Sequence, residues 1–305
     1  MKQDEILKQF WKNNNRFADL FNVCVFEGRE VVKSDQLEDF DTDVSAVYKD
    51  WDQISPIQRA RDVIKKDQQG NTYIILGLEN QTKVDYSMPL RVLEYDVYTY
   101  RNELNRILSE SGRKSLRKGE KLHATISIVM YYGEKTWDGP RNLHDLLEIP
   151  AGMEKLLPSY PMNFIEIQNE RRKFKDPDVQ ALFTQVQGIR ENNLEESRHK
   201  IKKEVAYTVA AITNNMEVVD QIMQQDSEEL EMWDFWKKAK ITGIEQGIEQ
   251  GIEQGIEQGN RQIVRNMRNQ GFSAEQICRF TGIPREVVSE VFREPKSEKK
   301  FVPKR

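Results

Sequence analysis

Residues 60–83 read ARDVIKKDQQGNTYIILGLENQTK, a pattern that predicts a β-hairpin. ARDVIKK and NTYIILGLEN have the composition of strands, and DQQGN between them has the composition of a turn. The second strand ends on a carboxylate, Glu79, and then Gln81 and Lys83 follow at intervals of two. Because side chains alternate across a strand, these three are expected on one side. They are either ordinary polar residues where a strand reaches the surface or a catalytic row.

An acid early in the first strand bears on this choice. The strands of a hairpin are antiparallel, so Asp62 and Glu79 belong to the same end of it. A four-residue QQGN loop would pair Asp67 with Thr72, and in that register the side chains of Asp62, Glu79 and Gln81 share a side. A loop one residue longer or shorter would place the two acids on opposite faces unless a β-bulge intervened.

Two carboxylates that meet beside a third polar residue have the donor set of a Mg²⁺ site for phosphodiester hydrolysis. Mg²⁺ prefers hard oxygen ligands and keeps several waters. It lowers the pKa of a bound water and offsets charge that develops on phosphorus. Acid pairs at strand ends are also common without such a site, so these residues alone leave both interpretations open.

The flanking sequence predicts an α/β fold. "SMPLRVLEYDVYTYRNELNRIL" (87–108) has Ser87 as a plausible N-cap, Pro89 in the first turn and apolar residues at helical spacing. The segments 1–26 and 87–108 are expected to be helices, and 41–50, 124–133 and 163–168 to be further strands. The order is α-β-β-β-α-β(-β), a mixed sheet with helices packed on it.

The C-terminal part has a different pattern. GIEQ occurs four times in residues 243–258. These repeats form either a flexible linker or a helix. The linker is favoured because each glycine weakens a helix by roughly 1 kcal/mol and no heptad supports a coiled coil. The expected parts are an α/β domain (1–175), a helical region (176–240), the repeats (241–259), a small helix-turn-helix-like module (260–294) and a basic tail (295–305).

Composition excludes several classes of protein. No continuous apolar stretch in the 305 residues is long enough to span a membrane. The first residues lack the apolar core of a signal peptide. Cys24 and Cys278 are too few for a disulfide framework and suggest reduced thiols in the cytoplasm. Three histidines cannot assemble a zinc cluster.

The charge is uneven although the net charge is only −4. Cations gather in residues 106–121, in RRKFK (171–175) and in the tail. A local basic surface can bind phosphates, whereas the alternative is a solvated face with lysines for solubility. The candidate DNA-binding residues are Arg113, Lys114, Arg117, Lys118, Arg171 and Arg172.

Several blocks of the chain resemble a bacterial family in the same order. They are RFADLFN, FDTDVS, RARDVIKK, ILGLENQTKVDYSMPLRVLEYDVYTY, ISIVMYYGEKTWDGPRNLHDLL and the GIEQG repeats. The chain resembles the recombination-promoting nuclease/putative transposase family (Rpn family) of the PD-(D/E)XK nuclease superfamily. The resemblance is strongest over residues 16–147 and implies a restriction-endonuclease-like core, α-β-β-β-α-β, followed by a helical C-terminal region.

The resemblance also implies a site. The D…ExQ signature of the family falls on Asp62, Glu79 and Gln81, so the two acids would bind Mg²⁺ or another divalent cation. Gln81 stands where the superfamily more often has lysine, and an amide can orient a water but supplies no charge. Lys83 is a candidate to supply that charge, and the favoured alternative is a solvent-facing lysine at a strand end. Additional candidates are Asp19 as a further acid and Arg61 and Arg91 as phosphate contacts or ordinary salt-bridge partners.

Together these features predict a cytoplasmic Mg²⁺-dependent DNA endonuclease of low sequence specificity that promotes recombination or transposition. DNA is the expected partner, a membrane is not, and the helical C-terminus is expected to form a homo-oligomer. The alternative is a catalytically inactive DNA-binding or assembly protein on the same fold, which the acidic net charge and the missing lysine favour. A protein-binding adaptor would follow if the basic stretches were scattered in space.

Overall fold

The computed structural model describes residues 2–40, 63–78, 85–193 and 198–294, with the backbone alone for 76–78 and 238–254. The chain divides into two units, Met1–Phe235 and Trp236–Arg305. The expected strand at 41–50 and the basic tail fall outside these ranges.

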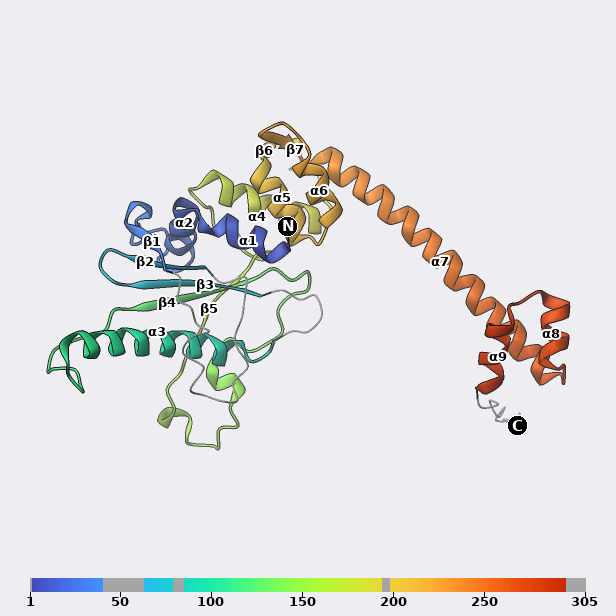
Figure 1. Cartoon of the computed structure of the whole chain (residues 1–305), viewed down its shortest axis with the longest axis horizontal. Coiled ribbons are helices and arrows are strands. Elements are labelled where there is room, and N and C mark those ends of the chain that lie inside the picture. The colour runs from blue at the N-terminus through green and yellow to red at the C-terminus, as the bar shows by residue number, and fades with distance from the viewer. Residues whose placement is uncertain (1, 41–62, 79–84, 194–197, 295–305) are drawn as a thin grey trace. The chain divides into compact units, whose positions relative to one another are not determined.

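The first unit is built on a mixed sheet of five strands in the order β1-β2-β3-β4-β5 (Figure 1). Its strands are β1 (Leu37–Asp39), β2 (Val63–Asp67), β3 (Thr72–Leu78), β4 (Thr125–Tyr131) and β5 (Asn163–Glu166). The pairs β1–β2 and β2–β3 are antiparallel, whereas β3–β4 and β4–β5 are parallel. In this sheet, the strands other than β1 agree with the sequence prediction.

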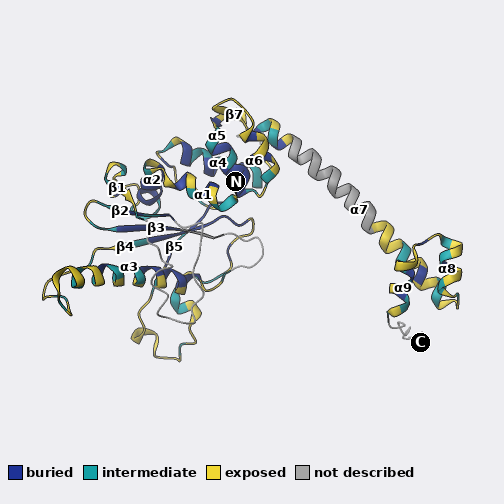
Figure 2. Ribbon diagram, in the orientation of Figure 1, coloured by how far each residue is buried: buried dark blue, intermediate teal, exposed yellow. Residues whose placement is uncertain are grey.

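Helices cover both faces of the sheet (Figure 1). One face carries α1 (Gln3–Lys12), α2 (Asn14–Cys24), α4 (Pro177–Arg190) and α5 (Lys203–Ile212), with α6 (Met216–Met223) against α5. The other face carries α3 (Met88–Ser111). Figure 2 shows the buried residues gathered between the layers. Met88, Val92 and Tyr95 of α3 pack in one core cluster with residues of β3 and β4.

The hairpin β2–β3 is one residue tighter than the four-residue loop considered above. Lys66 pairs with Thr72, and the Asp67 N–H donates to the Asn71 carbonyl over 3.0 Å. The Asp67 carboxylate accepts the N–H groups of Gln69 and Asn71 and closes the turn. Such closure by an aspartate side chain is typical of tight turns. Of the loop lengths considered, the structure therefore has the one that is a residue shorter, in which Asp67 lies opposite Asn71 rather than Thr72.

The single helix expected over residues 1–26 is two helices. Asn13 has an extended backbone between α1 and α2, and its side chain accepts the N–H groups of Asn15 and Arg16. Asparagine is a strong N-cap because its side chain satisfies N–H groups that have no partner in the helix. The expected helix is thus interrupted by a cap.

The helical region predicted for residues 176–240 also contains a two-stranded ribbon. Here β6 (Lys200–Lys202) pairs antiparallel with β7 (Glu229–Glu231). Only Ile201 and Leu230 of these strands are buried. With three residues in each strand, the alternating pattern is too short to be distinguished from a helix by periodicity.

The second unit contains most of α7 (Trp233–Asn269), together with α8 (Ala274–Thr281) and α9 (Arg285–Arg293). The GIEQ repeats are part of α7, so the structure has the helix rather than the favoured linker. The predicted capping box at Ser273 and Gln276 is confirmed. A small core of Val264, Ile277, Ile283, Val288 and Val291 holds the three helices together.

Candidate functional site

The parallel strands β3, β4 and β5 end at one edge of the sheet, called here the carboxyl edge. Leu78 pairs with Tyr131, and Tyr131 pairs with Glu166, so these last strand residues lie at one level. The predicted acid Glu79 comes directly after Leu78 in the sequence. In sheets with parallel strands, ligands commonly bind outside the carboxyl ends.

The central predicted residues, Asp62, Glu79 and Gln81, and the accessory candidates Arg61 and Lys83 are outside the described residues. The described part of the chain contains no group of three or more His, Cys, Asp or Glu side chains that could hold a metal ion. Any metal centre of the predicted kind therefore depends on side chains beyond the described ranges.

The observed hairpin register changes the geometric argument for the two acids. Val63 faces Ile75 and Ile64 faces Ile74, so odd-numbered residues of both strands share one face. In this register positions 62 and 79 have opposite parity, and an uninterrupted ladder assigns them to opposite faces. A β-bulge, which adds one residue to one strand, is the local feature that would bring them to the same face.

Arg91 lies in the first turns of α3 and is only 7% exposed. Its Nη1 is 3.6 Å from the Met88 sulfur, and its guanidinium lies 6.0 Å from the centre of the Tyr95 ring. The neighbouring residues Met88 and Tyr95 belong to the core cluster that includes Tyr131. Arg91 is therefore buried close to the carboxyl edge. A buried cation requires negative or polar groups around it.

Asp19 is directed to the start of α4. Its Oδ2 accepts the Asp176 N–H over 2.9 Å. Burial raises the pKa of Asp19, and hydrogen bonds from the Asp176 and Lys175 backbone offset only part of this effect. Phe21, on the same helix, packs on Tyr73, which is near the beginning of β3 rather than its end. Asp19 is thus occupied in joining α2 to α4.

Sequence reasoning missed Glu166, a buried carboxylate at the carboxyl edge. It is 8% exposed, accepts the Trp137 N–H over 2.9 Å and lies 3.7 Å from the Arg141 guanidinium. The signal was its position within the predicted strand 163–168, which ends at Glu166 in the structure. Tyr86 is nearby, since its ring centre is 5.9 Å from that of Trp137.

The predicted DNA-binding residues fall into two separate groups. Arg113, Lys114, Arg117 and Lys118 follow α3 and precede β4, so they belong to the amino end of β4. Arg171 and Arg172 come after β5, at the other end of the parallel strands. The structure does not bring the two groups together.

Arg171 and Arg172 are both engaged within the protein. Arg171 pairs with Glu191 over 2.8 Å. Arg172 pairs with Glu170 over 2.5 Å and also donates to the Cys24 carbonyl. The hydrogen bond to Glu170 raises the pKa of Arg172. A phosphate would compete with these carboxylates for either guanidinium.

A cavity of about 540 Å³ lies beside Arg171. Its lining includes Arg171 and Arg190 but also Glu134 and Glu191. The Arg190 guanidinium donates to the carbonyls of Tyr132 and Gly133 at the end of β4. The two cations and two carboxylates balance, so the lining does not favour an anion over a neutral polar ligand.

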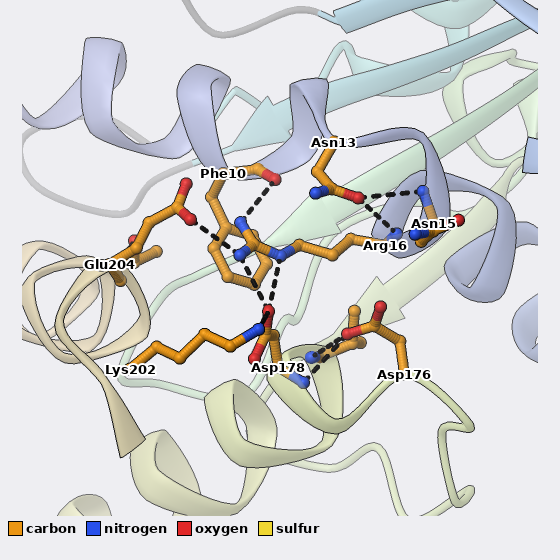
Figure 3. A network of polar contacts seen from close by, with 10 residues as sticks. Phe10, Asn13, Asn15, Arg16, Asp176, Asp178, Lys202 and Glu204 are labelled. Atoms are coloured by element: carbon orange, nitrogen blue, oxygen red, sulfur yellow. Dashed lines mark hydrogen bonds and ion pairs between the residues drawn. The ribbon is translucent and has the colours of Figure 1, made fainter. Parts of the chain in front are cut away.

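A buried ionic network lies away from the carboxyl edge, among α2, α4, α5 and β6 (Figure 3). Arg16 Nη2 is 2.9 Å from Asp178 and 2.7 Å from Glu204, and Lys202 adds a second cation 2.9 Å from Asp178. Burial opposes ionisation of Asp178, but hydrogen bonds from Lys202 and Arg16 outweigh it and lower its pKa. The network joins the helices α2, α4 and α5 to one another and to the ribbon strand β6.

Comparison with known proteins supplies the identification. The first unit has an α/β fold with a mixed sheet. The parallel strands of this sheet end at one edge, and further helices come after the last strand, β5, in the sequence. Residues 62–217 match the family described as "Putative transposase, YhgA-like", which is of the Rpn/PD-(D/E)XK type, so the chain belongs to this family. Neither the curated proteins nor the solved structures give a match. Within the described residues, none of the helices is long and apolar enough to cross a membrane.

Proposed function

We propose that the protein is a Mg²⁺-dependent DNA endonuclease of low sequence specificity that acts in recombination or transposition. The family match carries this proposal, since it begins at residue 62 and extends over β2 to β5. The element order also agrees with the PD-(D/E)XK core that the resemblance implies. This order would place Glu79 and Gln81 just beyond the end of β3.

The proposed site uses Asp62 and Glu79 as cation ligands. Their carboxylate oxygens have the hard-donor chemistry that Mg²⁺ prefers. A bound divalent cation would supply Lewis acidity and activate water. The Gln81 amide would orient the attacking water by hydrogen bonds, and Lys83 would contribute positive charge near the phosphate.

The helical C-terminal region is proposed to bring protomers together. Ile256 and Ile263 of α7 are 59% and 44% exposed. These two residues are seven positions apart, close to two helical turns, so they lie on one side of α7 and form an apolar contact surface for a second helix.

A second candidate is a DNA-binding or assembly protein with an inactive nuclease core. The hairpin register favours it, because an uninterrupted ladder in this register separates positions 62 and 79. Replacement of the usual lysine by Gln81 points in the same direction.

Plasmid nicking by the purified protein tests the first proposal. We expect nicking with Mg²⁺, none with EDTA, and retention of DNA binding in EDTA. Binding without nicking under any divalent cation, with the protein folded, would support the second candidate instead.

A further inference from the structure

A compact basic loop follows α3 at Gly112–Leu122. It contains Arg113, Lys114, Arg117, Lys118 and Lys121 and one acid, Glu120. Gly112 ends α3 with φ of 63°, a conformation that favours glycine. Glu120 accepts hydrogen bonds from the Arg113 guanidinium and the Arg117 N–H, at 2.8 and 2.7 Å. The acid therefore braces the loop and is neutralised within it.

The other cations of the basic loop point to solvent. Lys114, Arg117, Lys118 and Lys121 are exposed. Among the residues that the structure describes, none makes a hydrogen bond or ion pair with their cationic groups. Four such charges on a braced loop produce a local positive potential in a chain with net charge −4, and phosphates are attracted to such a potential.

The helix α3 sets the distance from this loop to the carboxyl edge. Met88, at its start, packs in the cluster that contains Tyr131, the last residue of β4. Further along α3, the Tyr100 hydroxyl accepts the N–H of Thr125, the first residue of β4. The helix thus runs antiparallel to β4 and continues beyond its beginning (Figure 1). Its 24 residues span about 36 Å at 1.5 Å per residue.

This length matches the repeat of duplex DNA. One turn of B-DNA covers about 34–36 Å, or 10–10.5 base pairs. The carboxyl edge has an exposed cation of its own, Lys135, in the segment after β4, together with Arg141, which is exposed but lies 3.7 Å from Glu166. A duplex aligned with α3 would meet phosphates at both ends of the helix in successive turns.

We propose that the basic loop is a second phosphate-binding surface for duplex DNA, one helical turn away from the carboxyl edge. This inference rests on the proposed function in taking DNA to bind at that edge. With this loop, binding affinity should depend on the length of the duplex rather than on its base sequence, since phosphate contacts carry no direct sequence information.

The test compares duplex lengths with cleavage prevented. Binding of labelled duplexes of about 8, 12, 16 and 24 base pairs is measured by fluorescence anisotropy in EDTA, at several salt concentrations. The duplex of about 8 base pairs is too short to reach both surfaces, whereas the longer three exceed one turn. We expect the affinity to be about tenfold or more higher for the longer duplexes. The loop variant Lys114→Gln/Arg117→Gln/Lys118→Gln should lose this rise. Its salt dependence should weaken by about 2.7 in log–log slope, from about 0.9 per lost contact.

A matched variant separates local contact from net charge. Lys12→Gln/Lys33→Gln/Lys200→Gln removes three exposed cations elsewhere and should keep the length dependence. The inference would be overturned if both variants lost the length dependence equally or if the protein bound no DNA. It would also be overturned if affinity increased smoothly with duplex length, without a rise near one turn. Mg²⁺-dependent nicking without the length dependence would leave the nuclease proposal intact. Length-dependent binding without nicking would reject the nuclease and keep the loop.

Discussion

Asp67 lies opposite Asn71 at the end of the ladder between β2 and β3, where its N–H donates to the Asn71 carbonyl, so three residues rather than four form the hairpin loop. This pairing fixes which side chains of the two strands share a face. It requires a bulge, or another local departure from the ladder, if Asp62 and Glu79 are to hold one cation. The register is therefore the structural condition on which the nuclease proposal depends.

The turn itself gives a prediction about stability. Gly70 has φ of 94°, and a Cβ placed there would be 2.7 Å from the His123 ring. We expect Gly70→Ala to lower the free energy of unfolding by about 2–3 kcal/mol, from backbone strain of about 1–2 kcal/mol and displacement of His123. Urea denaturation measures the effect. Gly119→Ala is the control, because Gly119 has φ of 90° with open space around it, and its cost should be the strain alone.

The network in Figure 3 should contribute to the stability of the helical layer. Arg16→Met leaves Asp178 with Lys202 as its cation, so we expect a loss of about 3 kcal/mol, the low end for breaking a buried ion pair. Arg171→Met removes an ion pair whose two side chains are more than half exposed, and its loss should be less than about 1 kcal/mol. Similar losses for the two variants in chemical denaturation would contradict the buried role of Arg16.

Two buried acids should give opposite pH dependences. The pKa of Asp178 is lowered from 3.8, so its stabilising contribution is complete above about pH 4 and is lost as pH falls through the folded-state value. Burial raises the pKa of Asp96 above 3.8, against hydrogen bonds from Ser127 and Tyr160. Its contribution is present below 3.8 and is lost as pH rises through the folded-state value.

Unfolding free energies measured from pH 3 to 7 check these signs. Asp178→Asn should remove part of the loss seen on acidification below about pH 4. Asp96→Asn should remove a component that decreases with rising pH above that value. The same direction of change in both variants would show that one of the two assignments is incorrect.

The glycine repeat offers a test of the proposed assembly. Gly255 and Gly259 are in α7, and a Cβ on either would meet open space within the protomer. In an isolated protomer, each change to alanine should stabilise the helix by about 1 kcal/mol, seen as higher helicity and a higher melting temperature in circular dichroism. If the substitutions instead destabilise the protein and shift its mass in sedimentation, a second copy packs against these glycines.

Deletion of one GIEQ unit is also expected to be tolerated. It shortens α7 by four residues, about 6 Å, without removing any residue of the small core around Val264 and Val288. Thermal unfolding should change little. A sharp fall in stability would contradict this expectation.

In the first unit, the sequence predicted the longer elements because each carries a strong local signal. Thr72–Leu78 is a continuous apolar strand, and α3 has Pro89 in its first turn and apolar residues at helical spacing. The misses in this unit occurred where few residues decide the structure, whereas α7 was missed because its repeated glycines argue against a helix. Asn13 interrupts a helix with one side chain, and β6 and β7 have three residues each.

The candidate site was predictable only in part. Its location after β3 follows from strand order, but the relation between the two strands depends on the turn that Asp67 and Asn71 close. Composition does not specify whether such a turn contains three residues or four. Glu166 was within a predicted strand, yet its burial against Trp137 depends on a loop whose path no periodicity predicts.

The most direct test of the central claim is a double-mutant cycle on Mg²⁺-dependent plasmid nicking. Rates are measured for wild type, Asp62→Asn, Glu79→Gln and the double variant, with Glu38→Gln as an exposed-acid control. If both acids hold one cation, each single variant should lose almost all activity and the double variant should be no worse. Activity equal to wild type in either single variant, or losses that add independently, would contradict the account.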